Sequence, residues 1–387
     1  MVLSAEFQRP LDGLTVVSIE QAVAAPFATR QLADLGARVI KIERDTGDFA
    51  RTYDTTVHGQ ASYFVWLNRT KESVVLDLKS DEGKQALRVL LDQADIFVSN
   101  LAPGAVDRLG FGADECHETN PELIHASISG YGPGGSYTDR KAYDLIVQCE
   151  AGFLSLTGTP DQPSKAGVSI ADIAAGMYTF SGILAALLQR QRTGEGAVLE
   201  ISMLEALGEW LSQTHLYSVY GGKAPQRSGG RHASIAPYGP FPTADGTVFF
   251  GLQNEREWET FCTNVLEQPE LANDERFTPN YKRVENLDDL HTRIEHVTRA
   301  LTSEELVSRL DDIEIANARM RDMLEFDQHP QLADRDRWRD VPVPGGMAHS
   351  LIPPFMPVGM EPSWGAVPSI GEHTDAVLAE FLSTPMK

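Results

Sequence analysis

One aspartate occupies a position in the sequence that would suit a nucleophilic carboxylate. Asp172 falls at the start of an apolar helical stretch, and its neighbours are small: Ala171, Ala174, Ala175 and Gly176. Small neighbours leave room for a ligand or a second backbone to approach closely. Free amides and the dipole at a helix N-terminus stabilise an ionised carboxylate, which can attack an acyl group. A plain helix cap is the alternative interpretation, and this residue alone does not decide between them.

A second group of polar side chains follows a glycine-rich segment at 130–135. The stretch 139–150 reads DRKAYDLIVQCE and contains Arg140, Lys141, Tyr143 and Asp144. A phenol and a cation there can line a pocket, or the stretch can simply begin a solvated helix. The glycines look similar to a phosphate loop, but no helical pattern follows them, so we predict a loop without a nucleotide site.

Polar side chains also flank several predicted strands. Arg44 follows one strand, Arg69 and Lys71 precede the next, and Asn100 ends a third, with Arg108 soon after. The carboxyl ends of parallel strands form the ligand crevice of an open α/β sheet. We therefore expect Arg44, Asn100 and Arg108 to converge on one edge. Together they can neutralise the phosphates of a ligand, although any single one is more often a surface residue.

The elements that must position these residues alternate between strands and helices. Strands are predicted over 14–20, 38–43, 73–78, 96–101 and 123–129, with helices over 26–35 and 81–93. This alternation predicts an α/β fold with a parallel sheet. A long helix over 168–192, a strand over 198–202 and a helix from 203 to about 220 follow. The stretch directly after the first strand, QAVAAPFATRQL, contains no glycine, so the dinucleotide fingerprint is absent.

The remaining chain predicts a second domain and a return to the first. We expect the large domain to begin with 1–205 and a linker to span 206–224. A small α+β domain then covers 225–325. Residues 326–387 form an extended, proline-rich return and a helix over 374–382 that complete the large domain.

Composition limits the classes of ligand and compartment. The 387 residues include 33 basic and 55 acidic side chains, giving a net charge of −22. That field disfavours nonspecific binding to nucleic acid or anionic membranes, and leaves an anionic ligand possible only where cations gather. Cys116, Cys149 and Cys262 fit neither a disulfide framework nor a zinc site. We predict no signal peptide and no membrane-length apolar run, and hence a cytoplasmic chain.

Taken together, several segments resemble the class III CoA-transferases, the family of formyl-CoA transferase and the carnitine CoA-transferases. The similar strings run in order over about the first 200 residues: EQAVAAPFATRQLADLGARVIKIER, SVVLDLKSDEG, NLAPGAVDRLGFG, SGYGPGG, KAYDLIVQ and GVSIADIAAGMYTFSGILAALLQRQRTGEG. Within the family, the chain looks closest to the branch that acts on small dicarboxylic acids. The resemblance implies a large domain with a Rossmann-like sheet, a small α+β domain and an interlocked homodimer.

The resemblance also implies roles for particular residues. Asp172 matches the catalytic aspartate, which would carry CoA as a thioester. CoA and acyl-CoA would be substrates, with no permanently bound cofactor and no metal. The implied CoA contacts are Ala22 and Val23 through their backbone, Arg44, Lys71, Asn100, Leu101, Arg108 and Lys141. The family's glycine loop has only Gly229 and Gly230 as a counterpart, which puts that loop in doubt.

The resemblance leaves several reactions open. The first expectation is an intramolecular mesaconyl-CoA C1–C4 transferase, and the second is intermolecular transfer from succinyl-CoA to malate, itaconate or mesaconate. Racemases of this fold use a histidine where this chain has Tyr143, a poor base near neutral pH. A non-catalytic CoA-binding protein is the remaining alternative. Candidate substrate contacts are Tyr143, Arg51, Arg231, His232 and Arg256.

Overall fold

The structure is a computed structural model that describes residues 9–383 in two compact units. Unit 1 comprises the chain up to Ala151, then Ala166–Gln213, and the chain from Leu332 onward. Unit 2 comprises Gly152–Lys165 and Thr214–Gln331. The smaller unit therefore takes in a segment at 152–165 that we placed in the large domain. Helices α8 (Met203–Trp210) and α9 (Ser212–Gly221) occupy most of the range expected as a linker.

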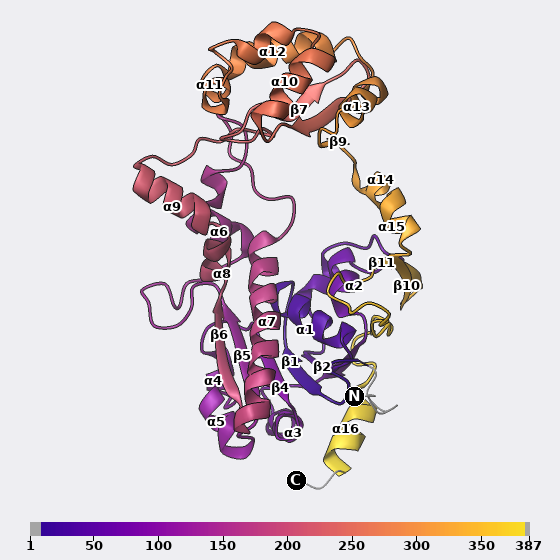
Figure 1. Cartoon of the computed structure of the whole chain (residues 1–387). Coiled ribbons are helices and arrows are strands. Elements are labelled where there is room, and N and C mark those ends of the chain that lie inside the picture. The colour runs from indigo at the N-terminus through magenta and orange to yellow at the C-terminus, as the bar shows by residue number, and fades with distance from the viewer. Residues whose placement is uncertain (1–8, 384–387) are drawn as a thin grey trace. The chain divides into compact units, whose positions relative to one another are not determined.

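A six-stranded parallel sheet forms the centre of unit 1 (Figure 1). Its order, β3-β2-β1-β4-β5-β6, is that of a Rossmann-like sheet. Apolar and β-branched residues dominate β1, β2 and β4, which are buried as expected for the middle of a parallel sheet. The strands are β1 (Thr15–Ile19), β2 (Arg38–Glu43), β3 (Lys71–Val75), β4 (Ile96–Ser99), β5 (Ile124–Ser129) and β6 (Ala197–Ser202).

The two faces of this sheet differ in the polarity of the side chains that they bury. Ile40 of β2 joins an apolar core with α3 (Asp81–Leu91) and α16 (Thr374–Ser383). The next residue, Lys41, points to the opposite face, because side chains alternate along a strand. Helices α1 (Ala24–Asp34) and α7 (Ile170–Thr193) lie side by side in unit 1 (Figure 1). A Cβ on Gly176 of α7 would lie only 2.7 Å from the carbonyl oxygen of Ala24, so the two helix backbones come into close contact.

Helix α7 is the one helix among residues 9–383 that is long and apolar enough to cross a membrane, judged by length and composition only. We predicted no such stretch from the sequence, and that prediction is wrong. Leucine, isoleucine, phenylalanine and alanine make a window of 18 residues in this helix apolar, although Asp172 lies in its first turn and Arg190 and Arg192 lie in its last. The helix packs against α1, α8, β5 and β6, and buried core helices pass the same test.

Unit 1 also contains short elements that the sequence pattern did not reveal. The segment predicted to be extended instead forms an antiparallel hairpin of β10 (Trp338–Val343) and β11 (Gly346–Leu351). Short helical elements connect the strands: η1 (Phe49–Thr52), α2 (Ser62–Asn68), α4 (Ala105–Arg108), α5 (Ala113–Thr119) and α6 (Asp144–Glu150).

Unit 2 is built on a three-stranded antiparallel sheet with helices around it. Its sheet has the order β7-β8-β9 and its core is rich in aromatic side chains, including Trp258 and Phe261. The strands are β7 (Tyr238–Pro242), β8 (Thr247–Gly251) and β9 (Asn317–Arg319). The helices are η2 (Phe153–Ser155), most of α9, α10 (Glu255–Asn264), η3 (Pro269–Asn273), α11 (Asn280–Glu285), α12 (Leu287–Thr298), α13 (Ser303–Asp311) and α14 (Met323–Asp327); α15 (Pro330–Asp334) spans the boundary.

Candidate functional site

Asp172 lies in the first turn of α7, as predicted, beside a second carboxylate. Asp144, the first residue of α6, caps the start of α7. Its Oδ1 accepts the peptide N–H of Ala171 at 2.8 Å and that of Asp172 at 3.4 Å. Its Oδ2 accepts a hydrogen bond from the Gln148 side chain at 2.7 Å. The amides that would stabilise an ionised Asp172 are therefore bonded to another carboxylate.

This arrangement changes the acidity of Asp172. Burial raises the pKa of its half-buried carboxyl group, and the charge of Asp144 raises it further, to about 7. Both influences disfavour the ionised form, so the group changes charge near neutral pH. A carboxylate with a raised pKa in a partly dry site is a stronger nucleophile than an ordinary surface aspartate, and such groups gather at functional sites.

Two phenols belong to the same neighbourhood. Burial raises the pKa of Tyr53, and the charges of Asp48 and Asp172 add to the effect, with a smaller contribution from Tyr143. The ring of Tyr53 also contacts that of Tyr63, with centroids 5.7 Å apart, and Tyr63 in turn contacts Trp66. The sequence analysis indicated Tyr143 but not Tyr53, which is half exposed just after η1. An isolated tyrosine in an unrecognised short helix carries no sequence signal.

A pocket of about 590 Å³ opens at the carboxyl ends of the central strands. Its walls include Arg44 and Leu101, two of the predicted CoA contacts. They also include Leu76 and Lys79, which follow β3 and were not singled out from the sequence. Their place after a strand, on the crevice edge of a parallel sheet, was the available signal.

The other predicted CoA contacts are placed differently. Lys71 begins β3, and its ammonium is buried against Glu20 Oε1 at 2.6 Å, so this geometry gives no support to a phosphate contact. Asn100 uses both side-chain atoms on Gln21, accepting its N–H and donating to its carbonyl, each at 2.8 Å. Arg108 and Lys141 are exposed. Asn100 therefore shapes the turn after β1, which contains Ala22 and Val23.

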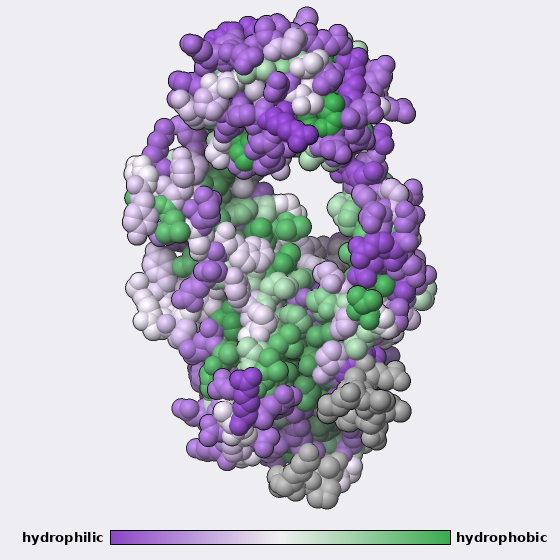
Figure 2. Space-filling view, in the orientation of Figure 1, coloured by the Kyte–Doolittle hydropathy of each residue, from purple (hydrophilic) through white to green (hydrophobic). Residues whose placement is uncertain are grey.

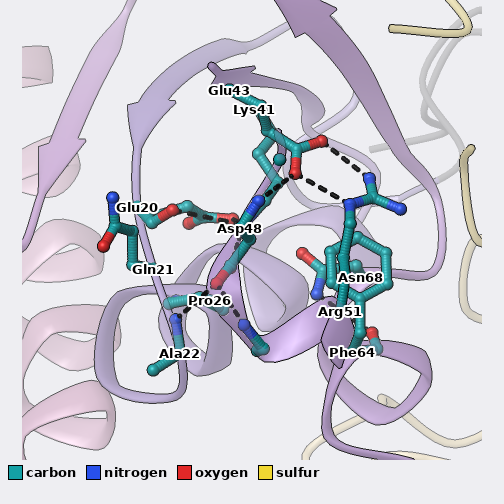
Figure 3. Close-up of polar contacts among 12 residues, drawn as sticks. Glu20, Gln21, Ala22, Pro26, Lys41, Glu43, Asp48, Arg51, Phe64 and Asn68 are labelled. Carbon is teal, nitrogen blue, oxygen red and sulfur yellow. Dashed lines mark hydrogen bonds and ion pairs between the residues drawn. The ribbon is translucent and has the colours of Figure 1, made fainter. Parts of the chain in front are cut away.

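A buried network of alternating charges adjoins that turn (Figure 3). Lys41 Nζ donates to Asp48 Oδ2 at 2.9 Å and to Glu20 Oε1 at 3.4 Å. Lys71, bonded to Glu20, continues the network. Burial alone would raise the pKa of Glu20, but Lys71 and Lys41 lower it below its usual range. Three carboxylates and three cations balance in this network: Glu20, Glu43, Asp48, Lys41, Lys71 and Arg51.

The candidate contacts for a distal carboxylate separate into the two units. Arg51 in unit 1 holds both oxygens of Glu43, at 2.9 and 2.7 Å, and stacks on Phe64. Its guanidinium therefore serves the buried network. Arg231, His232 and Arg256 belong to unit 2, where His232 stacks on Tyr238 with ring centroids 5.2 Å apart. Their role as substrate contacts stays a prediction.

Comparisons with known proteins identify the family. The sequence model of CoA-transferase family III matches residues 11–374. The chain is 39% identical over 334 residues to the acetyl-CoA:oxalate CoA-transferase of Acetobacter aceti, covering 84% of this chain and 85% of that enzyme. It is 33% identical to the succinyl-CoA:mesaconate CoA-transferase of Haloarcula hispanica, covering 96% of each.

A solved structure agrees with these sequence relatives. The fold is similar to that of a CAIB/BAIF family protein from Brucella suis, with a TM-score of 0.87 and 32% identity over 97% of this chain and 100% of that one. The likeness therefore extends over both units, each of which is described above. The chain belongs to CoA-transferase family III and is an enzyme that transfers CoA.

Proposed function

We propose that this enzyme moves CoA between small dicarboxylic acids, with Asp172 as the covalent carrier. The observation that carries the proposal is the half-buried carboxyl group of Asp172, whose pKa is raised to about 7. It lies in a helix turn of small residues, next to a phenol at Tyr53. A nucleophile that must lose and regain its charge within each cycle suits that environment.

The first half of the reaction loads CoA onto the protein. The ionised carboxylate of Asp172 attacks the thioester carbonyl of the donor, forming a mixed anhydride and releasing CoA thiolate. The thiolate then attacks the aspartyl carbonyl of the anhydride. That step leaves an aspartyl–CoA thioester on the enzyme and frees the donor acid as its carboxylate, so thioester energy is conserved without another reactant.

The second half reverses these steps with the acceptor. Its carboxylate attacks the aspartyl thioester, CoA thiolate leaves, and a new mixed anhydride forms. Attack by the thiolate on the acceptor carbonyl gives the new acyl-CoA and regenerates Asp172. Acylation removes the charge of Asp172, so the repulsion from Asp144 is relieved whenever the covalent state forms. Asp144 thereby favours the loaded enzyme.

The names of the relatives support small dicarboxylates as the acids. One is named for oxalate and the other for succinate and mesaconate, which are all dicarboxylic acids. We propose the same class here, with a cation of unit 2 (Arg231, His232 or Arg256) as a candidate contact for the second carboxylate. The test is to mix the enzyme with succinyl-CoA and each of oxalate, malate, itaconate and mesaconate, and to follow new acyl-CoA products by mass spectrometry.

Transfer between two acids is the form that the relatives' names favour, because each names a donor and a separate acceptor. The intramolecular C1–C4 transfer expected from the sequence makes a different prediction. Mesaconyl-C1-CoA alone would then isomerise, and labelled free mesaconate would not enter the product. Intermolecular transfer predicts no isomerisation without free acid and full label exchange with it. Racemisation of an α-methylacyl-CoA with no transfer to any acid would contradict both.

We also propose that the enzyme acts as a homodimer, interlocked as the resemblance implies. Exposed apolar side chains gather on the side of unit 1 where α7 lies (Figures 1 and 2). Leu188 of α7 and Val198 of β6 are 60% and 49% exposed. Exposed apolar patches commonly mark protein interfaces. Light scattering on the purified enzyme is expected to give twice the chain mass of 42.5 kDa. A monomer at assay concentration with full activity would contradict this proposal.

A further inference from the structure

The turn between β1 and α1 contains a residue in an unfavourable backbone conformation. Ala22 has a φ angle of 59°, in the left-handed region that alanine seldom adopts because of its Cβ. Its peptide N–H donates to Asp48 Oδ1 at 3.1 Å. The same oxygen accepts the Ala50 N–H at 2.9 Å, and Oδ2 accepts from Lys41 at 2.9 Å. Figure 3 shows this carboxylate between the turn and Lys41.

This turn is close to the start of α7 through two separate links. The backbone of α1 touches α7 where the carbonyl oxygen of Ala24 meets Gly176. Asp172 precedes Gly176 by four residues, so it projects from the same face of α7 one turn earlier. Tyr53 supplies the second link, since its pKa is raised by burial and by the charges of Asp48 and Asp172 together.

We propose that Asp48 is a positioning residue for CoA transfer: its carboxylate holds Ala22 in the left-handed conformation and so fixes the β1–α1 turn beside Asp172. The inference rests on the proposed function, in which Asp172 is the nucleophile and the backbone of Ala22 and Val23 contacts CoA. Val23, the N-cap residue of α1, makes no side-chain capping hydrogen bond. The placement of the turn therefore depends on Asp48, together with the clamp from Asn100 to Gln21.

The chemistry of the site explains why this position requires a carboxylate. Asp48 is 2% exposed, and its two oxygens together accept two peptide N–H groups and one ammonium. An asparagine could accept on one atom only, and its amide would turn N–H groups toward either Lys41 or the peptide of Ala22. Either orientation breaks one side of the link between the charged network and the turn.

The test compares the D48N substitution in the wild-type chain and in the A22G background. Glycine adopts a positive φ without steric cost, so the turn then needs the hydrogen bond less. In the wild-type chain, D48N is expected to lower kcat/KM for transfer by about 10- to 100-fold, the cost of a small misplacement. In the A22G background the additional loss is expected to stay within about threefold. Equal losses in both backgrounds would overturn the proposal.

E43Q is the matched control. Glu43 belongs to the same network and accepts the Asp48 peptide N–H at 2.9 Å and a hydrogen bond from Ser73. No hydrogen bond joins its described side chain to Ala22. Its loss in kcat/KM is therefore expected to be the same with and without A22G. Relief of E43Q by A22G to the same degree as D48N would show general stabilisation and would also overturn the proposal.

A second pair of variants keeps the test decisive if D48N does not fold. Asparagine tolerates the left-handed region, whereas β-branched valine does not. A22V is therefore expected to lose about tenfold more activity than A22N, and equal losses would contradict the role of this conformation.

D172A separates this inference from the proposed function. Full activity of D172A would refute the role of Asp172 as nucleophile. An inactive D172A together with a fully active D48N would refute only the positioning role of Asp48.

Discussion

The carboxylates of the larger unit are found in two opposite environments. Glu20 and Asp48 are buried, and each accepts a hydrogen bond from a lysine. Asp172 instead lies beside the carboxylate of Asp144, and burial and that neighbour both raise its pKa. The first group is electrically balanced and holds the turn after β1. The second is unbalanced, and it is the one whose charge can change during a reaction.

The comparison separates carboxylates that stabilise the fold through ion pairs from a carboxylate that is proposed to react. A buried ion pair resists the loss of either partner, because the remaining charge would be unpaired. The ionised form of Asp172 is already destabilised by its surroundings. Its conversion into an uncharged anhydride therefore costs little electrostatic stabilisation. The same carboxyl-to-amide substitution should therefore have opposite effects in the two groups, and the following changes test that difference.

The largest expected effect is on turnover in D172A. Removal of the carboxylate leaves no atom to form the anhydride, so transfer is expected to fall by about 10⁴-fold or more. The measurement is the steady-state rate of acyl-CoA formation, with circular dichroism as the check on folding. Folded D172A with wild-type turnover would refute covalent catalysis at this residue, and would favour a non-covalent route or a binding role.

The next effect is the loss of stability in E20Q. Glu20 accepts from Lys71 at 2.6 Å, from Lys41 at 3.4 Å and from Thr29 at 2.6 Å. An amide leaves both ammonium groups buried with a weaker partner, so the free energy of unfolding is expected to fall by ~3 kcal/mol. Denaturant titration at pH 7 measures this change. A variant as stable as the wild type would show that the network is not needed for folding.

The matching change in the second group is D172N, which is expected to stabilise the chain. The pKa of Asp172 is about 7 when folded and near 3.9 when unfolded, so the folded state binds its proton more tightly. Ionisation therefore destabilises the fold progressively between about pH 4 and pH 7, and fully above that window. Asparagine does not ionise, so D172N is expected to gain ~1–2 kcal/mol at pH 8. A gain that is the same at pH 4 and pH 8 would contradict this account.

The smallest effect concerns the pH dependence of D144N. Burial raises the pKa of Asp172 most, and the charge of Asp144 raises it further. An uncharged amide is therefore expected to lower this pKa, so that more of the nucleophile is ionised at low pH. The acid limb of kcat/KM is expected to move down by about 0.5 to 1 pH unit. Its amide oxygen can still accept the Ala171 N–H, so helix capping is kept. An acid limb that stays in place, or moves upward, would show that the charge of Asp144 does not contribute to the raised pKa of Asp172.

Much of the fold of the larger unit follows from local sequence pattern. The strand over 38–43 has the predicted bounds, and the helix predicted over 168–192 occurs at Ile170–Thr193. Hydrophobic period and glycine stops decide these elements locally. The β10–β11 hairpin was missed because its prolines and glycines resemble a loop, and only pairing between the two strands makes it a sheet.

The position of the proposed nucleophile, Asp172, at the start of a helix was predictable from the sequence, but its surroundings were less so. Asp172 stands out because small residues flank it in the sequence. The partner that raises its pKa, Asp144, is 28 residues away, and only the fold brings the two together. Lys71 shows what the sequence cannot indicate: a lysine at a strand start carries no signal that its ammonium turns inward to Glu20. Tyr53, which the charge of Asp172 influences, and Lys79, which lines the pocket, are candidate site residues that only the structure reveals.

The measurement that tests the central claim most directly follows oxygen atoms. In the proposed reaction, the acceptor carboxylate forms an anhydride with Asp172, and one of its oxygens stays on the aspartate when acyl-CoA leaves. Turnover with an acceptor labelled with oxygen-18 is therefore expected to place heavy oxygen in the carboxyl group of Asp172, detected by peptide mass spectrometry. Unlabelled Asp172 after many turnovers, with labelled acyl-CoA accumulating, would contradict the account.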